Sequence, residues 1–283
     1  MFFIEYCMRI ADSHNDFLTE LKTKKKIQNY IDYLKNSNVK LLSCAVWTTE
    51  LSRPETDIKR FSGHLNAPNN KCKLLLSVED CYFINNSNIN NLIKLHPISC
   101  SLTWNNSNSL AGGNFGRGSV TKQGREVIKI FEKNNIFIDT AHLNRKSFYK
   151  FCKITTKPIY NSHCAINAIN PHKRNLTQRQ IKKAVKSDGY IGLCLVGEFL
   201  GKNKITAKTV AQHLDYFVKH FGYKNIGWGT DFNGTKKLPE KISRYEDLSL
   251  VAKELRTLGY NSKVIDCLFF KNYYDFLKRN KLL

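Results

Sequence analysis

The sequence predicts an α/β fold, namely a (β/α)8 TIM barrel with additional C-terminal helices. Three observations indicate this class. Eight short apolar segments alternate with amphipathic helical patterns along the 283 residues, as parallel strands and their crossover helices do. Several segments are apolar almost throughout, which is typical of a sheet covered on both faces. Residues of metal-binding type stand where several segments end, and barrel enzymes build their active sites at strand ends.

The expected strands are short and well separated in the sequence. They are Arg9–His14, Val39–Trp47, Cys72–Glu79, Ile98–Trp104, Ile136–Ala141, Pro158–Ser162, Tyr190–Val196 and Asn225–Asp231. Apolar residues are most continuous in Leu74–Leu76 and Ile191–Val196. An open, doubly wound sheet is the alternative architecture, but it would not bring the first and last strands together.

Helical patterns fall between the strands. The clearest are Phe17–Lys35, Thr121–Asn134, Arg145–Ile154, Thr177–Lys186 and Thr206–Phe221. Thr177 and Thr206 each precede a helical run and are expected to cap it, and Gly222 fits a helix end. From Tyr245 onward the pattern is helical and rich in aromatic residues, which we expect to pack against the closed barrel.

Length and composition predict a single metal-dependent hydrolase domain over residues 1–283. Hydrophobic residues make up 42% of the chain, yet no apolar run is long enough to cross a bilayer. The N-terminal residues lack the pattern of a secretion signal. The nine cysteines are odd in number and include no Cys-x-x-Cys pair, so they are expected to be reduced and buried. These features predict a cytoplasmic protein without membrane contacts.

The formal net charge of +22 raises the alternative of a basic binding module for nucleic acid. The lysines, however, are spread over the whole chain beside abundant Asn and Ile, and the densest run, at 22–26, lies in an expected helix. Nucleic acid is therefore not an expected partner. The charge would instead raise the local concentration of small acidic substrates.

A His-x-Asp pair ends the first expected strand. His14 and Asp16 are two residues apart, so on a regular strand they point to the same side and can bind one cation. Glu79 ends the third strand, where a buried carboxylate is unfavourable unless it is paired or bound to metal. In a centre with two metals, one carboxylate commonly bridges both cations.

Two histidines end consecutive strands. His142 and His163 are 21 residues apart, the length of a helix with its loops, so they are expected on neighbouring strands. Either one alone would be read as a packed core residue, but together with the preceding residues they indicate a metal centre. Asp139 is a candidate for orienting one of these ligands from behind.

Two further residues complete the expected site. Asp231 ends the last strand, beside the first in a closed barrel, and is placed to accept a proton from attacking water. Arg174 follows the sixth strand and has a side chain suited to a bidentate grip on a carboxylate. Taken alone, Arg174 would be an ordinary surface residue.

Taken together, these segments resemble the membrane (renal) dipeptidase family, peptidase family M19, among the metal-dependent amidohydrolases. The matching pieces run in the family's order between residues 9 and about 235. They are 12–16, the strand ending at Glu79, 102–105, 120–127, 138–142, 161–163, 173–175 and 227–234. Each piece alone is weak, whereas the ordered set is specific.

The resemblance implies a dipeptidase with a binuclear zinc centre, which generates the attacking hydroxide. His14 and Asp16 would hold one Zn2+, His142 and His163 the other, and Glu79 would bridge them. Asp231 would carry the proton to the leaving amine, and Arg174 would bind the free C-terminal carboxylate of the dipeptide. Relatives often form homodimers, so a homodimer is one expectation.

The chain departs from the family pattern in three places. Trp104 stands where the mammalian enzymes have a histidine that polarises the scissile carbonyl, and Trp104 offers only an indole N–H. Asp80 follows Glu79 where the family usually has glycine, and the chain is shorter than most relatives. Because Trp104 and the shorter loops affect substrate contacts, hydrolysis of another amide, a lactam or a lactone is the alternative function.

Overall fold

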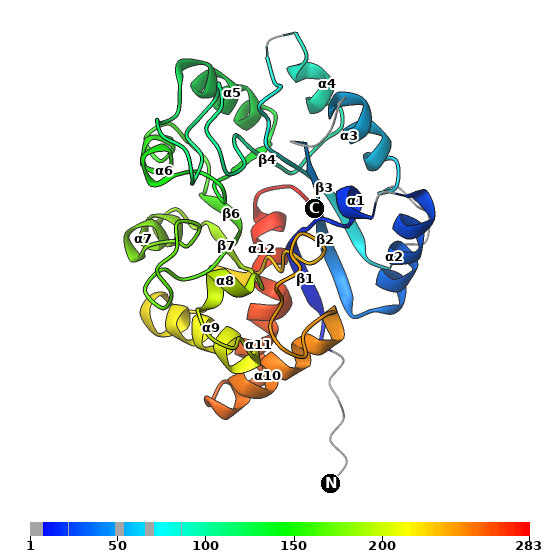
Figure 1. Ribbon diagram of the computed structural model, residues 1–283, viewed down its shortest axis with the longest axis vertical. Coiled ribbons are helices and arrows are strands. Elements are labelled where there is room, and N and C mark those ends of the chain that lie inside the picture. Colours follow the sequence, from blue (N-terminus) through cyan, green and yellow to red (C-terminus); the bar gives the residue numbers. More distant parts are fainter. Residues whose placement is uncertain (1–7, 22, 49–53, 66–70, 86) are drawn as a thin grey trace.

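Eight parallel strands close into a barrel in the computed structural model, which describes residues 8–21, 23–48, 54–65, 71–85 and 87–283. The strands are β1 Ile10–Asn15, β2 Val39–Trp47, β3 Lys73–Glu79, β4 Ser99–Ser101, β5 Phe137–Asp139, β6 Tyr160–Cys164, β7 Tyr190–Leu193 and β8 Ile226–Trp228. Each strand pairs with its neighbours in the sequence, and β1 also pairs with β8 (Figure 1). The predicted barrel is confirmed, and the open sheet is excluded.

Helices surround this barrel (Figure 1). They are α1 Phe17–Glu20, α2 Lys24–Asn36, α3 Pro54–Ser62, α4 Ile89–Ile93, α5 Lys122–Lys133, α6 Arg145–Phe151, α7 Gln178–Lys186, α8 Gly197–Leu200, α9 Ala207–Phe221, α10 Leu248–Thr257, α11 Ser262–Asp266 and α12 Asn272–Arg279, with a short 3-10 turn at Tyr245–Asp247 and a π turn at Cys267–Lys271. Within the described ranges, none of these helices has the length and apolarity needed to span a membrane.

The helix predicted over Phe17–Lys35 is wrong as a single element. Thr23 has an extended backbone, and its side chain accepts a hydrogen bond from the Lys26 N–H, so a new helix begins there. Two of the predicted helix ends, at Thr177 and Gly222, agree with the structure. Thr177 caps α7 through reciprocal hydrogen bonds with Gln180, and Gly222 follows α9 with a φ of 80°.

Helix α12 closes the N-terminal end of the barrel. Its side chains pack against the first residues of several strands, and in the view of Figure 1 it projects onto the centre of the ring of strands. Tyr273 is buried there, with its hydroxyl 2.5 Å from Ser43 Oγ and 3.2 Å from the hydroxyl of Tyr160. The C-terminal aromatic residues therefore pack in the core, as predicted, and the functional cleft lies at the opposite end.

Candidate metal centre

A cleft of about 350 Å³ opens among the loops that follow the C-terminal ends of the strands. Seven of the predicted site residues line it, namely Asp16, Glu79, Trp104, His142, His163, Arg174 and Asp231. His14, the eighth, is buried and contacts Asp16 and Asp231. The fold thus brings together every predicted site residue from segments more than 200 residues apart.

The first group of ligand atoms comes from β1 and from the turn after β8. His14 Nε2 lies 3.3 Å from Asp16 Oδ2 and 4.0 Å from Asp231 Oδ1. The three donor atoms lie within 4.8 Å of one another, close enough to share one cation. Asp231 is therefore a candidate ligand as well as a candidate proton acceptor, a role that the sequence did not suggest.

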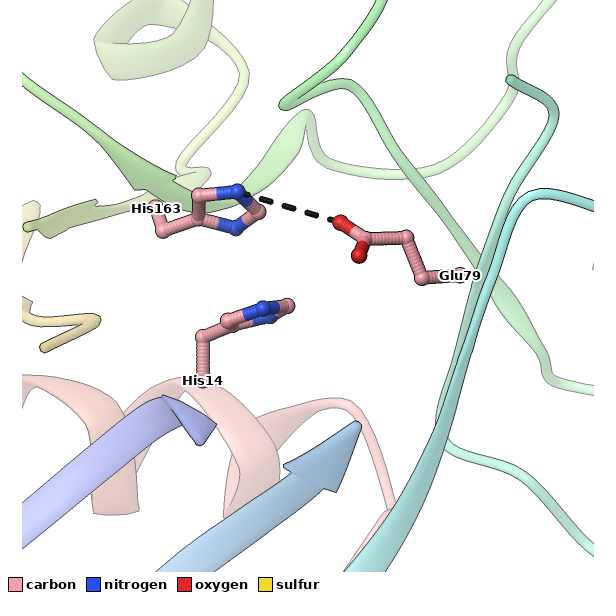
Figure 2. A group of neighbouring side chains, drawn as sticks. All are labelled: His14, Glu79 and His163. Carbon is pink, nitrogen blue, oxygen red and sulfur yellow. Dashed lines mark ion pairs between the residues drawn. The ribbon is translucent and has the colours of Figure 1, made fainter. Parts of the chain in front are cut away.

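The second group surrounds Glu79. Its Oε1 atom lies 2.7 Å from His142 Nε2 and 3.8 Å from His163 Nε2. Figure 2 shows His14, His163 and Glu79 directed toward one another, and their donor atoms also lie within 4.8 Å. Because Glu79 is close to ligands of both groups, its carboxylate is in position to bridge two cations.

The protonation states of the two imidazoles that flank Glu79 suit metal binding. Burial, together with the charge of Arg174, lowers the pKa of His142 and of His163 well below the ordinary value, so both rings are neutral at pH 7. Their Nδ1 atoms lie 3.3 Å from Asn105 Oδ1 and 2.8 Å from Ser162 Oγ. If each Nδ1 carries the proton, each Nε2 presents a lone pair.

The contacts of Arg174 agree with this tautomer. The Nη2 atom lies 3.0 Å from His142 Nε2 and 2.5 Å from His163 Nε2, and Arg174 can only donate. Arg174 is 3% exposed, so its reading as an ordinary surface residue is wrong. A metal ion and this guanidinium would compete for the same two lone pairs.

Glu79 supplies an independent sign that the donor set fits a cation. Its Oε1 atom is buried and accepts no hydrogen bond from any described residue. A carboxylate oxygen only 2.7 Å from an unprotonated imidazole nitrogen repels it unless a proton or a cation lies between them. Burial raises the pKa of Glu79 well above its ordinary value, although the charge of His14 opposes that rise. Attraction to two nearby cations would offset the free-energy cost of burying this charged carboxylate.

The carboxylates on the β1 side shift the other titratable groups. Burial alone would lower the pKa of His14, but the adjacent Asp16 and the other carboxylates of the site raise it to about 10. Burial and the charge of Asp16 raise the pKa of Asp231 to about 7, with His14 opposing. Asp231 is therefore only partly ionised at neutral pH before a cation binds.

Asp12 is a supporting residue that the sequence did not single out. It is fully buried, and its Oδ1 accepts from the backbone N–H groups of His14 and Thr230. Its Oδ2 accepts from the hydroxyls of Thr230 and Tyr245. Asp12 therefore ties the end of β1 to the segment that carries Asp231, which fixes the first group of ligands.

The turn that carries Asp231 is tightly constrained. The predicted strand Asn225–Asp231 is too long, since β8 ends at Trp228 and Asp231 has a left-handed backbone with a φ of 62°. Gly234 follows, and a β-carbon at that position would overlap the carboxylates of Asp16 and Asp231. Glycine is needed here because the backbone passes directly beside the ligands.

Two tryptophans form an apolar wall of the cleft. The ring centres of Trp47 and Trp104 are 4.6 Å apart, and Trp104 lies 6.0 Å from the ring of His142. Trp47 was not predicted as a site residue because it belongs to a continuous apolar strand. Asp80, the other departure from the family pattern, has a φ of 64°, the left-handed backbone that glycine adopts without strain.

Known proteins share this sequence pattern and this fold. The sequence model of the membrane dipeptidase family (peptidase family M19) matches residues 49–281. An uncharacterized protein in the pqqA 5′ region of Klebsiella pneumoniae is 29% identical over 188 residues, covering 62% of this chain and 69% of that protein. An uncharacterized dipeptidase of Schizosaccharomyces pombe is 23% identical over 183 residues, covering 62% of this chain but 43% of that protein.

Solved structures extend the likeness over the whole barrel. A metallopeptidase from Rhodobacter sphaeroides, crystallised with a phosphinate mimic of the dipeptide L-Ala-D-Ala, superposes with a TM-score of 0.85. The match covers 96% of this chain and 99% of that one at 20% identity, which establishes a common fold. Because the family model matches most of the sequence and the barrel is that of its members, the chain belongs to the membrane dipeptidase family, peptidase family M19.

Proposed function

We propose that this protein is a zinc-dependent dipeptidase that uses a pair of zinc ions held by the residues around Glu79. The observation that carries the proposal is the central place of Glu79. His14, His142 and His163 lie close to its carboxylate, and His14 in turn lies close to Asp16 and Asp231. This nitrogen and oxygen donor set suits Zn2+.

The metal ions and the side chains of the protein have different tasks in the proposed reaction. When bound, two divalent cations lower the pKa of an attacking water and polarise the scissile carbonyl. Asp231 accepts the proton of that water and delivers it to the leaving amine, since its carboxylate lines the cleft beside the metal-type ligands. Asp12 fixes the segment that carries Asp231, because it accepts a hydrogen bond from the Thr230 N–H.

Groups of both charge signs line the cleft, which suits a zwitterionic substrate. Arg174 offers a guanidinium for the free C-terminal carboxylate. Glu20 and Glu198 line the cleft as well, and their carboxylates suit the free amino group. Selectivity for dipeptides then follows from the spacing between these charges, because a longer peptide cannot satisfy both ends.

A second activity, hydrolysis of another amide, a lactam or a lactone, is favoured by one observation. The neighbouring rings of Trp47 and Trp104, tilted by 40° to each other, give the cleft an apolar wall beside His142. Such a wall can accept a ring or an apolar acyl group that carries no free amine. A preference for these substrates over dipeptides would indicate this alternative.

The test combines metal analysis with a substrate panel. Purified protein is expected to contain two zinc ions per chain and to cleave dipeptides, including those with a D-residue at the C-terminal position. His142→Ala should lose metal and activity together, and Arg174→Met should raise KM for dipeptides much more than for lactones. Lys208→Gln, on the exposed side of α9, is the control. Protein without stoichiometric metal and without activity on the panel would overturn the proposal.

We further propose that the protein works in the cytoplasm. Eight cysteines are described, and all carry free thiols, which favours a reducing compartment. Fractionation of cells expressing the tagged protein would test this placement. A homodimer is also proposed, and light scattering of the purified protein would test it.

A further inference from the structure

A second cavity, of about 680 Å³, lies beside the cleft on the same end of the barrel. Four cationic side chains line it, from the loops after β4 and β6 and from the first turn of α6: Arg117, Arg145, Lys146 and Lys173. No carboxylate is among its lining residues, and none of the four cations forms an ion pair with a carboxylate in the described part of the chain. We call this cavity the basic groove.

The basic groove and the cleft share a wall. Phe115 lines the cleft and is 50% exposed, while the Lys173 Nζ lies 5.3 Å from the centre of its ring. The ring of His172 lies 6.4 Å from Phe115 and 4.7 Å from Phe199, another residue of the cleft. The groove and the cleft are thus neighbours, and these rings lie between them.

Two consecutive residues line the two cavities. Arg174 lines the cleft, and Lys173, the residue before it, lines the groove. An anion held by Arg174 therefore lies next to a region where further positive charge is left unpaired. Among the acidic residues of the cleft, Glu20 belongs to the segment after β1, and Glu198, after β7, pairs with Lys237 at 3.3 Å.

We propose that the basic groove is a subsite for a second anionic group on the C-terminal half of the substrate. This inference rests on the proposed function, in which Arg174 takes the C-terminal carboxylate and so directs that half of the dipeptide toward Lys173. The matching substrate is a dipeptide whose C-terminal residue has an acidic side chain, aspartate or glutamate. Exposed cations attract such a group over several ångströms, and salt weakens that attraction.

The first test measures kcat/KM for Ala-Glu and for its neutral counterpart Ala-Gln, in both C-terminal stereoisomers, with the full-length zinc-loaded protein. The expected preference for the acidic dipeptide is about threefold to tenfold at 50 mM NaCl and smaller at 500 mM NaCl. The triple variant Arg117→Gln/Lys146→Gln/Lys173→Gln should lose this preference. Lys208→Gln, which removes one exposed charge outside the groove, should keep it.

A second measurement does not depend on catalysis. Titration calorimetry of the zinc-loaded protein with N-acetyl-glutamate and N-acetyl-glutamine should show tighter binding of the glutamate, and the triple variant should abolish the difference. Equal binding of the two ligands, or a difference that survives the triple variant, would overturn the subsite. If no dipeptide is cleaved but the binding difference is present and depends on the groove, the proposed function fails and the subsite stands.

Discussion

The hydroxyl of Ser162 lies between Asp139 and His163. Ser162 Oγ donates to Asp139 Oδ2 and is 2.8 Å from His163 Nδ1, and the Ser162 N–H donates to Asp139 Oδ1 at 2.9 Å. Asp139 therefore acts on His163 through an intermediate hydroxyl and contacts neither histidine ring directly. This chain of hydrogen bonds keeps the proton on Nδ1 and directs the Nε2 lone pair toward Glu79.

Ser162→Ala should weaken metal binding without unfolding the protein. The variant keeps the backbone hydrogen bond to Asp139 but loses the acceptor for His163 Nδ1, and loss of such a partner typically lowers metal affinity by about 10-fold to 100-fold. Competition for zinc with a chromophoric chelator measures the effect. Ser43→Ala, which removes another buried hydroxyl near α12, is the control. Equal zinc affinity in Ser162→Ala and the parent protein would contradict the role given to this hydroxyl.

Metal uptake should release protons at neutral pH. The carboxylates around His14 raise its pKa to about 10, so the free protein carries a proton there at pH 7, and that proton must leave before His14 can bind a metal. Part of the Asp231 population, with a pKa near 7, is also protonated. We expect about one proton or more released per chain on saturation with zinc, and a zinc affinity that falls as the pH is lowered.

Calorimetric titration of zinc in buffers with different ionisation enthalpies counts these protons. His14→Ala removes the principal source, so the variant should release fewer protons at any zinc site that it retains. A proton count of zero for the parent protein at pH 7 would show that His14 is neutral before metal binds.

Gly234→Ala should disturb the first group of ligands. The new β-carbon would overlap the carboxylates of Asp16 and Asp231, and both would have to move. We expect normal folding with at least a tenfold loss of zinc affinity or of kcat/KM, because ligand geometry within a fraction of an ångström matters for both. Gly63→Ala, in which the new methyl group meets only backbone oxygens of α3, is the matched control. Unchanged kinetics in Gly234→Ala would mean that this turn can relax.

The barrel could be predicted from the sequence because its signals are local. Each of the eight strands overlaps a short segment that the sequence predicts as strand, and a helix pattern or loop separates it from the next. Strand ends were less predictable. The run Ile98–Trp104 was predicted as strand, but only Ser99–Ser101 is paired in β4. The residues beyond are buried by contacts between loops, and burial by loops leaves the same apolar signature as burial in a sheet.

Site residues were likewise predictable where the signal is local in the sequence, and not where it depends on contacts between distant segments. His14, Asp16, Glu79, His142 and His163 could be identified because each ends an apolar run. Ser162 and Asn105 could not, since a serine or asparagine near a strand end is common and their contacts with metal-type ligands depend on loop geometry. Asp12 was likewise hidden, because its partner Thr230 lies 218 residues away.

A buried histidine outside the cleft should make stability depend on pH. His213 on α9 accepts from the Ile166 N–H through Nδ1 and lies 3.0 Å from the Leu200 carbonyl through Nε2. Burial lowers its pKa to about 4. Between pH 6.5 and pH 4 the unfolded chain binds a proton at this position that the folded protein does not, so stability is lost as the pH falls through that range. Full loss amounts to about 3 kcal/mol in the free energy of unfolding.

His213→Asn separates this contribution from those of other groups. The variant lacks the titration, so its deficit in unfolding free energy relative to the parent should be largest near pH 7 and shrink by about 3 kcal/mol toward pH 4. Urea unfolding at several pH values, with chelator present to remove metal effects, measures the difference. Leu214→Ala, a cavity variant at the next residue of α9, should show a deficit that does not vary with pH. A constant deficit for His213→Asn as well would mean that the folded protein accepts a proton at this buried position without loss of stability.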